Sequence, residues 1–155
     1  MATLKDLAKR MKELAELIRV GISVSEFTNM HILLPHNLTI QVVKVILKTA
    51  IDLTPVDTGK AVSNWQVKLN GDINTNEIEA YFKGKSGTTR SECAKTAYKT
   101  ASNVLQHWDK KTSIHVVNPV DYIRHINYGT SNKIGLFIVE RAVAAGSAYL
   151  RAKSK

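Results

Sequence analysis

Two spacings of apolar residues run along this chain and divide it into expected helices and strands. Apolar positions three and four residues apart recur through 4–18 and 38–53, which is the spacing of amphipathic helices. The first helix is expected to end near Gly21, and the second to begin after Asn37 as its N-cap and to stop at Thr54-Pro55. The expected buried stripe of the second helix consists of Leu38, Val42, Val45, Ile46, Thr49, Ala50 and Leu53.

The helical spacing returns in the second half of the chain. A capping box formed by Thr89 and Glu92 predicts a helix start. Apolar side chains then hold one face as far as Trp108, while Lys95 and Lys99 lie on the opposite face. A last helix is expected from about Gly135 to the basic C-terminal tail.

Alternation of apolar and polar residues, the period of a half-buried strand, appears in 64–69 and again in 77–82. Asn70-Gly71-Asp72 lies between them and is a reversal signal, so the two segments are expected to form an antiparallel hairpin. A further strand is expected over 112–118, and a short strand or extended segment over 122–128. A flexible loop is expected to follow it.

Length and composition agree with one compact domain. The 155 residues include 44% apolar ones, which suffices for a single core. We therefore expect an α+β fold over 1–155, in which a small antiparallel sheet is packed by amphipathic helices. It would comprise an N-terminal helix over 1–21 and an α+β core over 37–150. Because the apolar runs are too short to cross a bilayer and no secretory signal is recognisable, a soluble protein made in the cytoplasm is expected, without membrane contact.

The chain is basic, with a formal net charge of +9 and a pI near 9.7. Residues 81–111 contain seven basic and two acidic residues, whereas 21–80 contain four and six. Such a basic block suits nucleic acid, an acidic partner surface, or solvent alone, and we favour solvent. A basic nucleic-acid-binding module is the alternative function, although no helix-turn-helix, zinc or single-strand-binding pattern accompanies the charge.

The patterns typical of enzymes and metal sites are weak. Gly84-Lys85-Ser86 lacks the earlier glycine of a phosphate loop, because Glu79 occupies that position. The five histidines show no i,i+4 pair, and the single cysteine, Cys93, has no partner for a disulfide or a zinc site. Trp65 and Trp108 lie on apolar faces, which favours core packing over stacking on bases. We expect no enzymatic activity, no cofactor and no metal.

Two short segments carry more information than the periodic pattern. The first, Thr54-Pro55-Val56-Asp57-Thr58-Gly59, combines a helix stop with a sharp turn, and Asp57 and Thr58 are expected to hydrogen-bond the turn backbone. The second, Tyr122-Ile123-Arg124-His125-Ile126-Asn127-Tyr128-Gly129-Thr130-Ser131, lies late in the chain and ends in the loop.

In this order the two segments resemble the tail-completion or neck proteins, the head-tail joining family of long-tailed bacteriophages. The matching positions are Pro55, Val56, Asp57, Thr58 and Gly59 in the early turn and Tyr122, Tyr128, Gly129, Thr130 and Ser131 in the late element. Trp65, the alanine-rich helix and Asn118-Pro119 fall between them in the family's order. The sequence departs from the family at Lys60-Ala61, where leucine-arginine is usual, and in 132–135, which lacks the common proline.

The resemblance implies a structural virion protein, assembled in the host cytoplasm, that is one subunit of an oligomeric ring in the phage neck. Its implied partners are further copies of itself, with six-fold symmetry expected, and the portal or connector and tail proteins. DNA would pass through the lumen of the ring. Candidate subunit contacts lie on the N-terminal helix and on two loops; they are Leu7, Met11, Leu14, Lys85 and Lys133.

Overall fold

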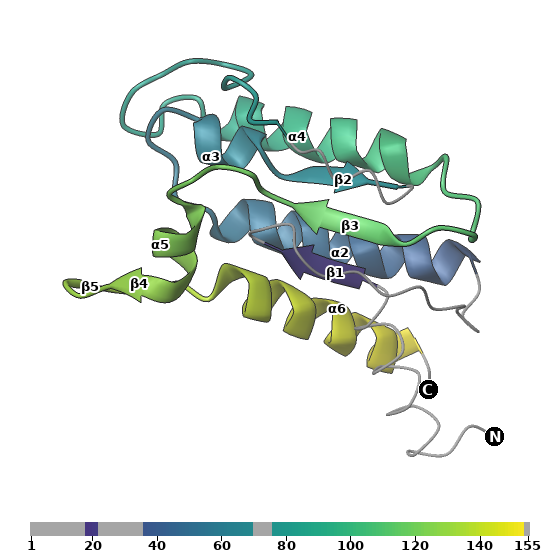
Figure 1. Cartoon of the computed structure of the whole chain (residues 1–155). Coiled ribbons are helices and arrows are strands. Elements are labelled where there is room, and N and C mark those ends of the chain that lie inside the picture. The colour runs from purple at the N-terminus through teal and green to yellow at the C-terminus, as the bar shows by residue number, and fades with distance from the viewer. Residues whose placement is uncertain (1–17, 22–35, 70–75, 154–155) are drawn as a thin grey trace.

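The computed structural model of the protein describes residues 18–21, 36–69 and 76–153 (Figure 1). Its helices are α2 (His36–Leu53), α3 (Lys60–Ser63), α4 (Arg90–Leu105), α5 (Ile123–Tyr128) and α6 (Ile138–Lys153). Its strands are β1 (Ile18–Gly21), β2 (Gln66–Lys68), β3 (Ile114–Val117), β4 (Gly129–Thr130) and β5 (Lys133–Ile134).

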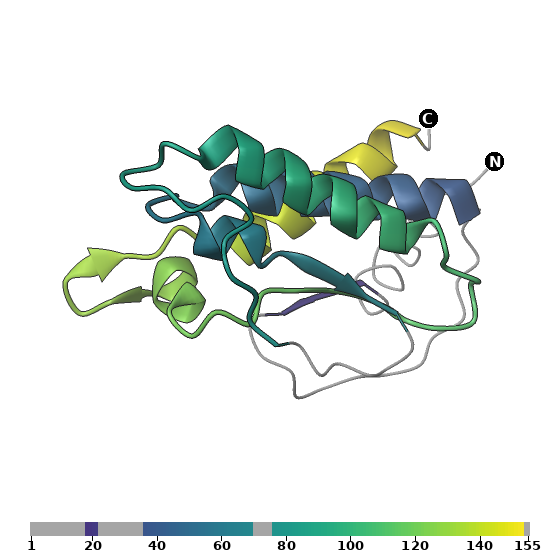
Figure 2. The same cartoon turned by 90° about the horizontal axis from the view of Figure 1, so that it is seen from above.

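Three long helices cover one face of a three-stranded sheet. α2 lies between α4 and α6, and all three run along the same side of the sheet (Figures 1 and 2). The strand order is β1-β3-β2, with Val67 of β2 antiparallel to Val116 of β3 and Val20 of β1 parallel to the same residue. The expected α+β fold with a small antiparallel sheet packed by helices is confirmed, and β1 adds a parallel strand to it.

The second predicted helix is confirmed as α2, but it begins at His36, so the prediction of Asn37 as its N-cap is wrong. More of its surface is also buried than one stripe. Its buried residues are Thr39, Ile40, Val42, Val43, Ile46, Leu47, Ala50 and Ile51. Leu38, Val45, Thr49 and Leu53 from the predicted stripe are only half-buried. The reason is the central position of α2, because a helix flanked by two others and a sheet needs apolar residues over most of its circumference. This burial also outweighs the weak helix propensity of its many valines and isoleucines.

α2 and α6 pack closely against each other at Gly146. A Cβ atom on Gly146 would lie 2.5 Å from Cγ1 of Ile46 and 3.4 Å from Cγ1 of Val42. Ala142 and Leu150, one turn before and after it, are fully buried. The absence of a side chain at position 146 therefore sets the distance between the two helices.

Both tryptophans belong to the core, as predicted from the sequence. Trp65 is 1% exposed, and its indole N–H donates a hydrogen bond of 2.8 Å to Oγ1 of Thr54. Trp108 is 4% exposed, donates to the carbonyl of Thr112 at 2.6 Å, and stacks on the ring of His36. Buried indoles need such partners for their N–H groups, so each tryptophan also fixes a neighbouring segment.

Replacing Thr54 with valine is expected to lower the free energy of unfolding by about 1–3 kcal/mol. Valine has nearly the same shape, but the buried N–H of Trp65 then loses its acceptor, and Thr54 no longer donates to the carbonyl of Ala50. Urea denaturation measures the change. The matched control is Thr49→Val, since the hydroxyl of Thr49 donates to the carbonyl of Val45 but accepts no indole. An equal loss in the two variants would show that the indole bond contributes nothing.

The predicted hairpin is wrong in its second strand. Residues 76–80 form no strand, and β2 pairs with β3 instead. The side chain of Asn64 takes the place of a strand partner, because its Oδ1 accepts from the N–H of Ile78 and its Nδ2 donates to the carbonyl of Ile78, each at 2.8 Å. One side-chain amide thus satisfies both backbone groups that a ladder would use. The predicted turn at 70–72 lies outside the described residues.

Two other segments differ from the sequence prediction. Residues 122–128 were expected to be extended but contain α5, which follows a turn in which Oδ1 of Asn118 accepts from the N–H of Val120 at 3.2 Å. Ile123 and Asn127, four residues apart, are the buried pair, so the true spacing is helical. β1 occupies Ile18–Gly21, where the N-terminal helix was expected to end, and residues 1–17 lie outside the description.

The helix predicted from the capping box is confirmed as α4. Thr89 is its N-cap residue, but the Thr89 side chain makes no capping hydrogen bond. Lys95 and Lys99 are exposed, as predicted, and Cys93, Ala97 and Leu105 are buried on the opposite face. The last predicted helix is α6, and the strand predicted over 112–118 contains β3.

Candidate functional site

The early turn and the beginning of the late segment lie together and line one hollow. This hollow has a volume of about 450 Å³. Its lining consists of Pro55, Val56, Asp57, Thr58, Gly59, Lys60, Ala61, Tyr122 and Ile126. No pattern along the chain predicts this contact between segments more than sixty positions apart, and the fold creates it by packing α5 against α3.

Asp57 holds a distant loop instead of its own turn. Its carboxylate Oδ1 accepts from the N–H of Ser86 and its carbonyl accepts from the N–H of Gly87, both at 2.9 Å. Thr58 acts locally, with its Oγ1 accepting weakly from the N–H of Lys60 at 3.5 Å. The expectation that both side chains bond the turn is therefore correct for Thr58, whereas the Asp57 carboxylate bonds the 84–87 loop.

Gly59 closes the turn in a conformation that only glycine adopts readily. Its φ is 89°, and α3 begins directly after it. An added Cβ would lie 2.9 Å from Sγ of Cys93 and 3.1 Å from the carbonyl oxygen of Phe82. Cys93 is fully buried behind the turn, and its thiol donates to that carbonyl at 3.3 Å. Cys93 thus packs against the early turn. From the sequence, its position on the apolar face of α4 indicates burial but not this contact.

A small ionic cluster joins α3 to the start of α5. Nζ of Lys60 lies 2.5 Å from Oε2 of Glu77, and the other oxygen of Glu77 accepts from the N–H of Asp121 at 3.3 Å. The hydrogen bond from Lys60 lowers the pKa of Glu77, and the same bond raises the pKa of Lys60. Burial raises the pKa of the Tyr122 phenol.

The late segment forms an arm, which we define as residues 122–137. Within it, α5 leads into β4, and β4 pairs antiparallel with β5, so that Gly129 lies opposite Ile134 and Thr130 opposite Lys133. The loop expected after Tyr128 is therefore a short hairpin. Gly129 has a φ of 85°, and a Cβ there would lie 2.4 Å from the carbonyl oxygen of Lys133. Figure 1 shows β4 and β5 reaching beyond the ends of the three long helices.

The arm exposes large apolar side chains to solvent. Ile134 is 92% exposed and Tyr128 59%. The others on the arm with substantial exposure are Tyr122, Leu136 and Phe137. A concentration of exposed apolar residues on a projecting element is typical of a surface that contacts another protein.

Asn127 fastens the base of the arm to α6. Its Oδ1 accepts from the N–H of Val139 at 2.9 Å, and its Nδ2 donates to Oε2 of Glu140 at 3.1 Å. Its carbonyl accepts from the N–H of Phe137, also at 2.9 Å. Asn127 is fully buried, so the arm leaves the body from a fixed point. Sequence reasoning missed Asn127, as it missed Asn64, because a buried asparagine has no periodic signature.

The candidate contact residues fall in two groups. Lys85 and Lys133 are exposed, the first in the loop that Asp57 holds and the second on the arm. Leu7, Met11 and Leu14 lie outside the described residues. Within the basic block, Lys95, Lys99 and Lys110 are also exposed.

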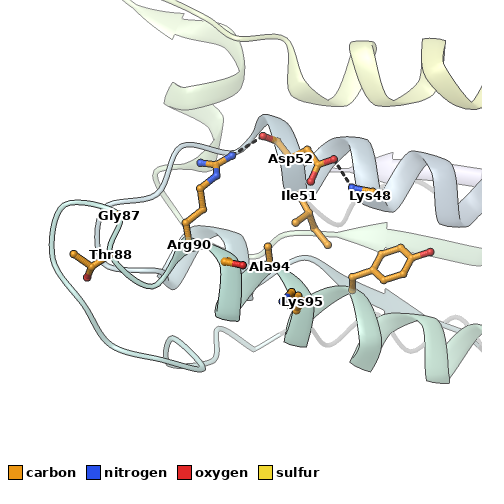
Figure 3. Close-up of a pocket in the computed structure, with 10 residues that line it drawn as sticks. Lys48, Ile51, Asp52, Gly87, Thr88, Arg90, Ala94 and Lys95 are labelled. Carbon is orange, nitrogen blue, oxygen red and sulfur yellow. Dashed lines mark hydrogen bonds and ion pairs between the residues drawn. The ribbon is translucent and has the colours of Figure 1, made fainter.

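A second concave surface is a groove between α2 and α4, with a volume of about 710 Å³ (Figure 3). Ile51, Ala94 and Tyr98 supply its apolar lining. Lys48, Arg90 and Lys95 are its cations, and Asp52 is its carboxylate. It is larger than the hollow beside the early turn and was not predicted from the sequence.

No group of three or more histidine, cysteine, aspartate or glutamate side chains in 18–21, 36–69 and 76–153 is arranged to hold a metal ion. Among the same residues, no helix is long and apolar enough to span a bilayer. Comparisons of the chain with protein-family models, with curated proteins and with solved structures give no match.

Proposed function

We propose that the protein is a structural subunit of a ring in the neck of a long-tailed bacteriophage, where it joins the portal or connector to the tail. The observation that carries the proposal is the meeting of the early turn and the late segment at one hollow, next to an arm with exposed apolar side chains. The resemblance in sequence concerned these two segments, and they form one structural unit.

The arm suits a repeated contact between unlike surfaces. Ile134 and Lys133 lie in a two-residue strand at the far end of the arm, while Asn127 anchors its base. Each copy would use this projecting end to contact a different face of the next copy. Such a chain of contacts closes into a ring when a whole number of the rotations between neighbours makes one full turn. Such a subunit needs a firm shape and an apolar contact, and it needs no reactive group.

Replacing Ile134 with aspartate is expected to prevent assembly. The charge would have to be buried without a partner, so self-association should weaken by roughly a hundredfold or more. Sedimentation velocity over a concentration series measures the association, and electron microscopy of the largest species shows whether the wild-type protein forms closed rings.

The matched control for this experiment is Phe82→Asp. Phe82 is 47% exposed but lies outside the arm, so this variant should assemble like the wild type. A wild-type protein that remains a monomer at all concentrations, or that assembles equally well with aspartate at position 134, would contradict the proposal. Tight, salt-sensitive binding of double-stranded DNA by a monomer would favour the alternative, a basic nucleic-acid-binding module.

A further inference from the structure

The groove between α2 and α4 joins an apolar lining to a cationic rim. Ile51 and Ala94 face each other from the two helices (Figure 3), and Tyr98 extends the same lining one turn further along α4. We propose that this groove binds an acidic segment of a partner protein, with an apolar side chain of that segment seated between the helices.

The charged side chains around the groove differ in whether an opposite charge neutralises them. Lys48 is paired with Asp52 at 2.7 Å, so these two side chains largely neutralise each other. The guanidinium of Arg90 donates to the carbonyls of Asp52 at 2.6 Å and of Thr54 at 3.2 Å, which fixes it at the C-terminal end of α2. These carbonyls carry no net charge, and although they form the negative end of the α2 dipole, Arg90 retains most of its positive charge.

Lys95 adds a second positive charge that no carboxylate of the described residues neutralises at ion-pair distance. The lining as a whole contains three cations and one carboxylate. Lys99, one turn beyond Lys95 on α4, is exposed. The groove therefore favours a negatively charged occupant.

The apolar lining indicates which kind of negative occupant fits. A nucleic acid presents closely spaced phosphates and would bring them against the Asp52 carboxylate, while Ile51 and Ala94 would gain nothing from them. A peptide segment instead spaces its carboxylates around an apolar anchor, as helices that bind in grooves do. A second copy of this chain is a poor occupant, because its exposed apolar arm carries Lys133, Arg124 and His125.

The test uses the full chain and a fluorescent amphipathic peptide of about 14 residues with glutamates on one face and leucines on the other. Fluorescence anisotropy should show binding, and a peptide with lysine in place of every glutamate should bind at least roughly tenfold more weakly. Lys95→Glu should weaken binding of the acidic peptide by a similar factor. Amide NMR shifts caused by the peptide should centre on Ile51, Ala94 and Tyr98.

Arg151→Glu is the matched control, because it makes the same change of charge at an exposed position on α6, the helix on the other side of α2. It should bind the acidic peptide like the wild type. The inference is overturned by absence of binding, by equal binding of the two peptides, by an unaffected Lys95→Glu variant, or by preference of the same amides for a DNA duplex. Repeating the titration with Ile134→Asp separates this inference from ring assembly, since the groove should bind the peptide whether or not the arm associates.

Discussion

Replacing Gly146 with leucine is expected to produce the largest loss of stability, about 3–4 kcal/mol in the free energy of unfolding. A Cβ alone would already lie 2.5 Å from Ile46, and a full leucine side chain would have to occupy the space between α2 and α6. The two helices would be forced apart, and the buried side chains of Ala142 and Leu150 on either side would become more exposed to water.

Thermal unfolding followed by circular dichroism measures this effect, and a decrease of roughly 10 °C in Tm is expected for a chain of this length. Ala144→Leu is the matched control, because Ala144 is exposed on the same helix and leucine there should leave the Tm nearly unchanged. If both leucine variants had the same Tm, the close approach of α2 and α6 would not be a determinant of stability.

Replacing Gly59 with valine is expected to lower the free energy of unfolding by about 3 kcal/mol. The φ of 89° is strained for any residue with a Cβ and most of all for a branched one. The new side chain would also press on the Cys93 thiol and the Phe82 carbonyl. Both effects act on the early turn, so the variant should lose the hollow that Tyr122 completes.

Thr58→Val provides the comparison, because Thr58 is exposed and makes only a weak local hydrogen bond. Urea denaturation should show a small change for Thr58→Val and a large one for Gly59→Val. The reactivity of Cys93 with a thiol reagent gives a second measurement, and it should rise only in the glycine variant, where the packing around the buried sulfur is disturbed. A slow reaction of equal rate in both variants would contradict this account of the turn.

Periodicity identified the long helices well because each buries apolar residues over many turns. α2, α4 and α6 all lie where the three-and-four spacing places them. The short elements were harder to predict, since few residues determine them. The segment over 122–128 was expected to be a short strand or an extended segment, yet it contains α5, and its buried residues, Ile123 and Asn127, have helical spacing.

The candidate site was predictable as separate pieces but not as a site. Proline and glycine marked the early turn, because their effects on the backbone are local. The contacts that join the pieces are made by buried polar side chains, namely Asn64 with Ile78, Asn118 with Ala61 and Asn127 with Val139. Such pairings depend on the tertiary arrangement, and a single sequence contains no pattern that reveals them.

The way in which Asp57 holds the loop at Ser86 and Gly87 leaves Lys85 free to vary in sequence, whereas the positive φ of Ser86 and of Gly87 restricts those two positions. Both bonds go to backbone N–H groups, which every residue except proline possesses. The exposed side chains of Lys85 and Ser86 therefore take no part in positioning the loop. Evolution can exchange Lys85 to match a new neighbour while the loop keeps its place, which separates the choice of partner from the integrity of the fold.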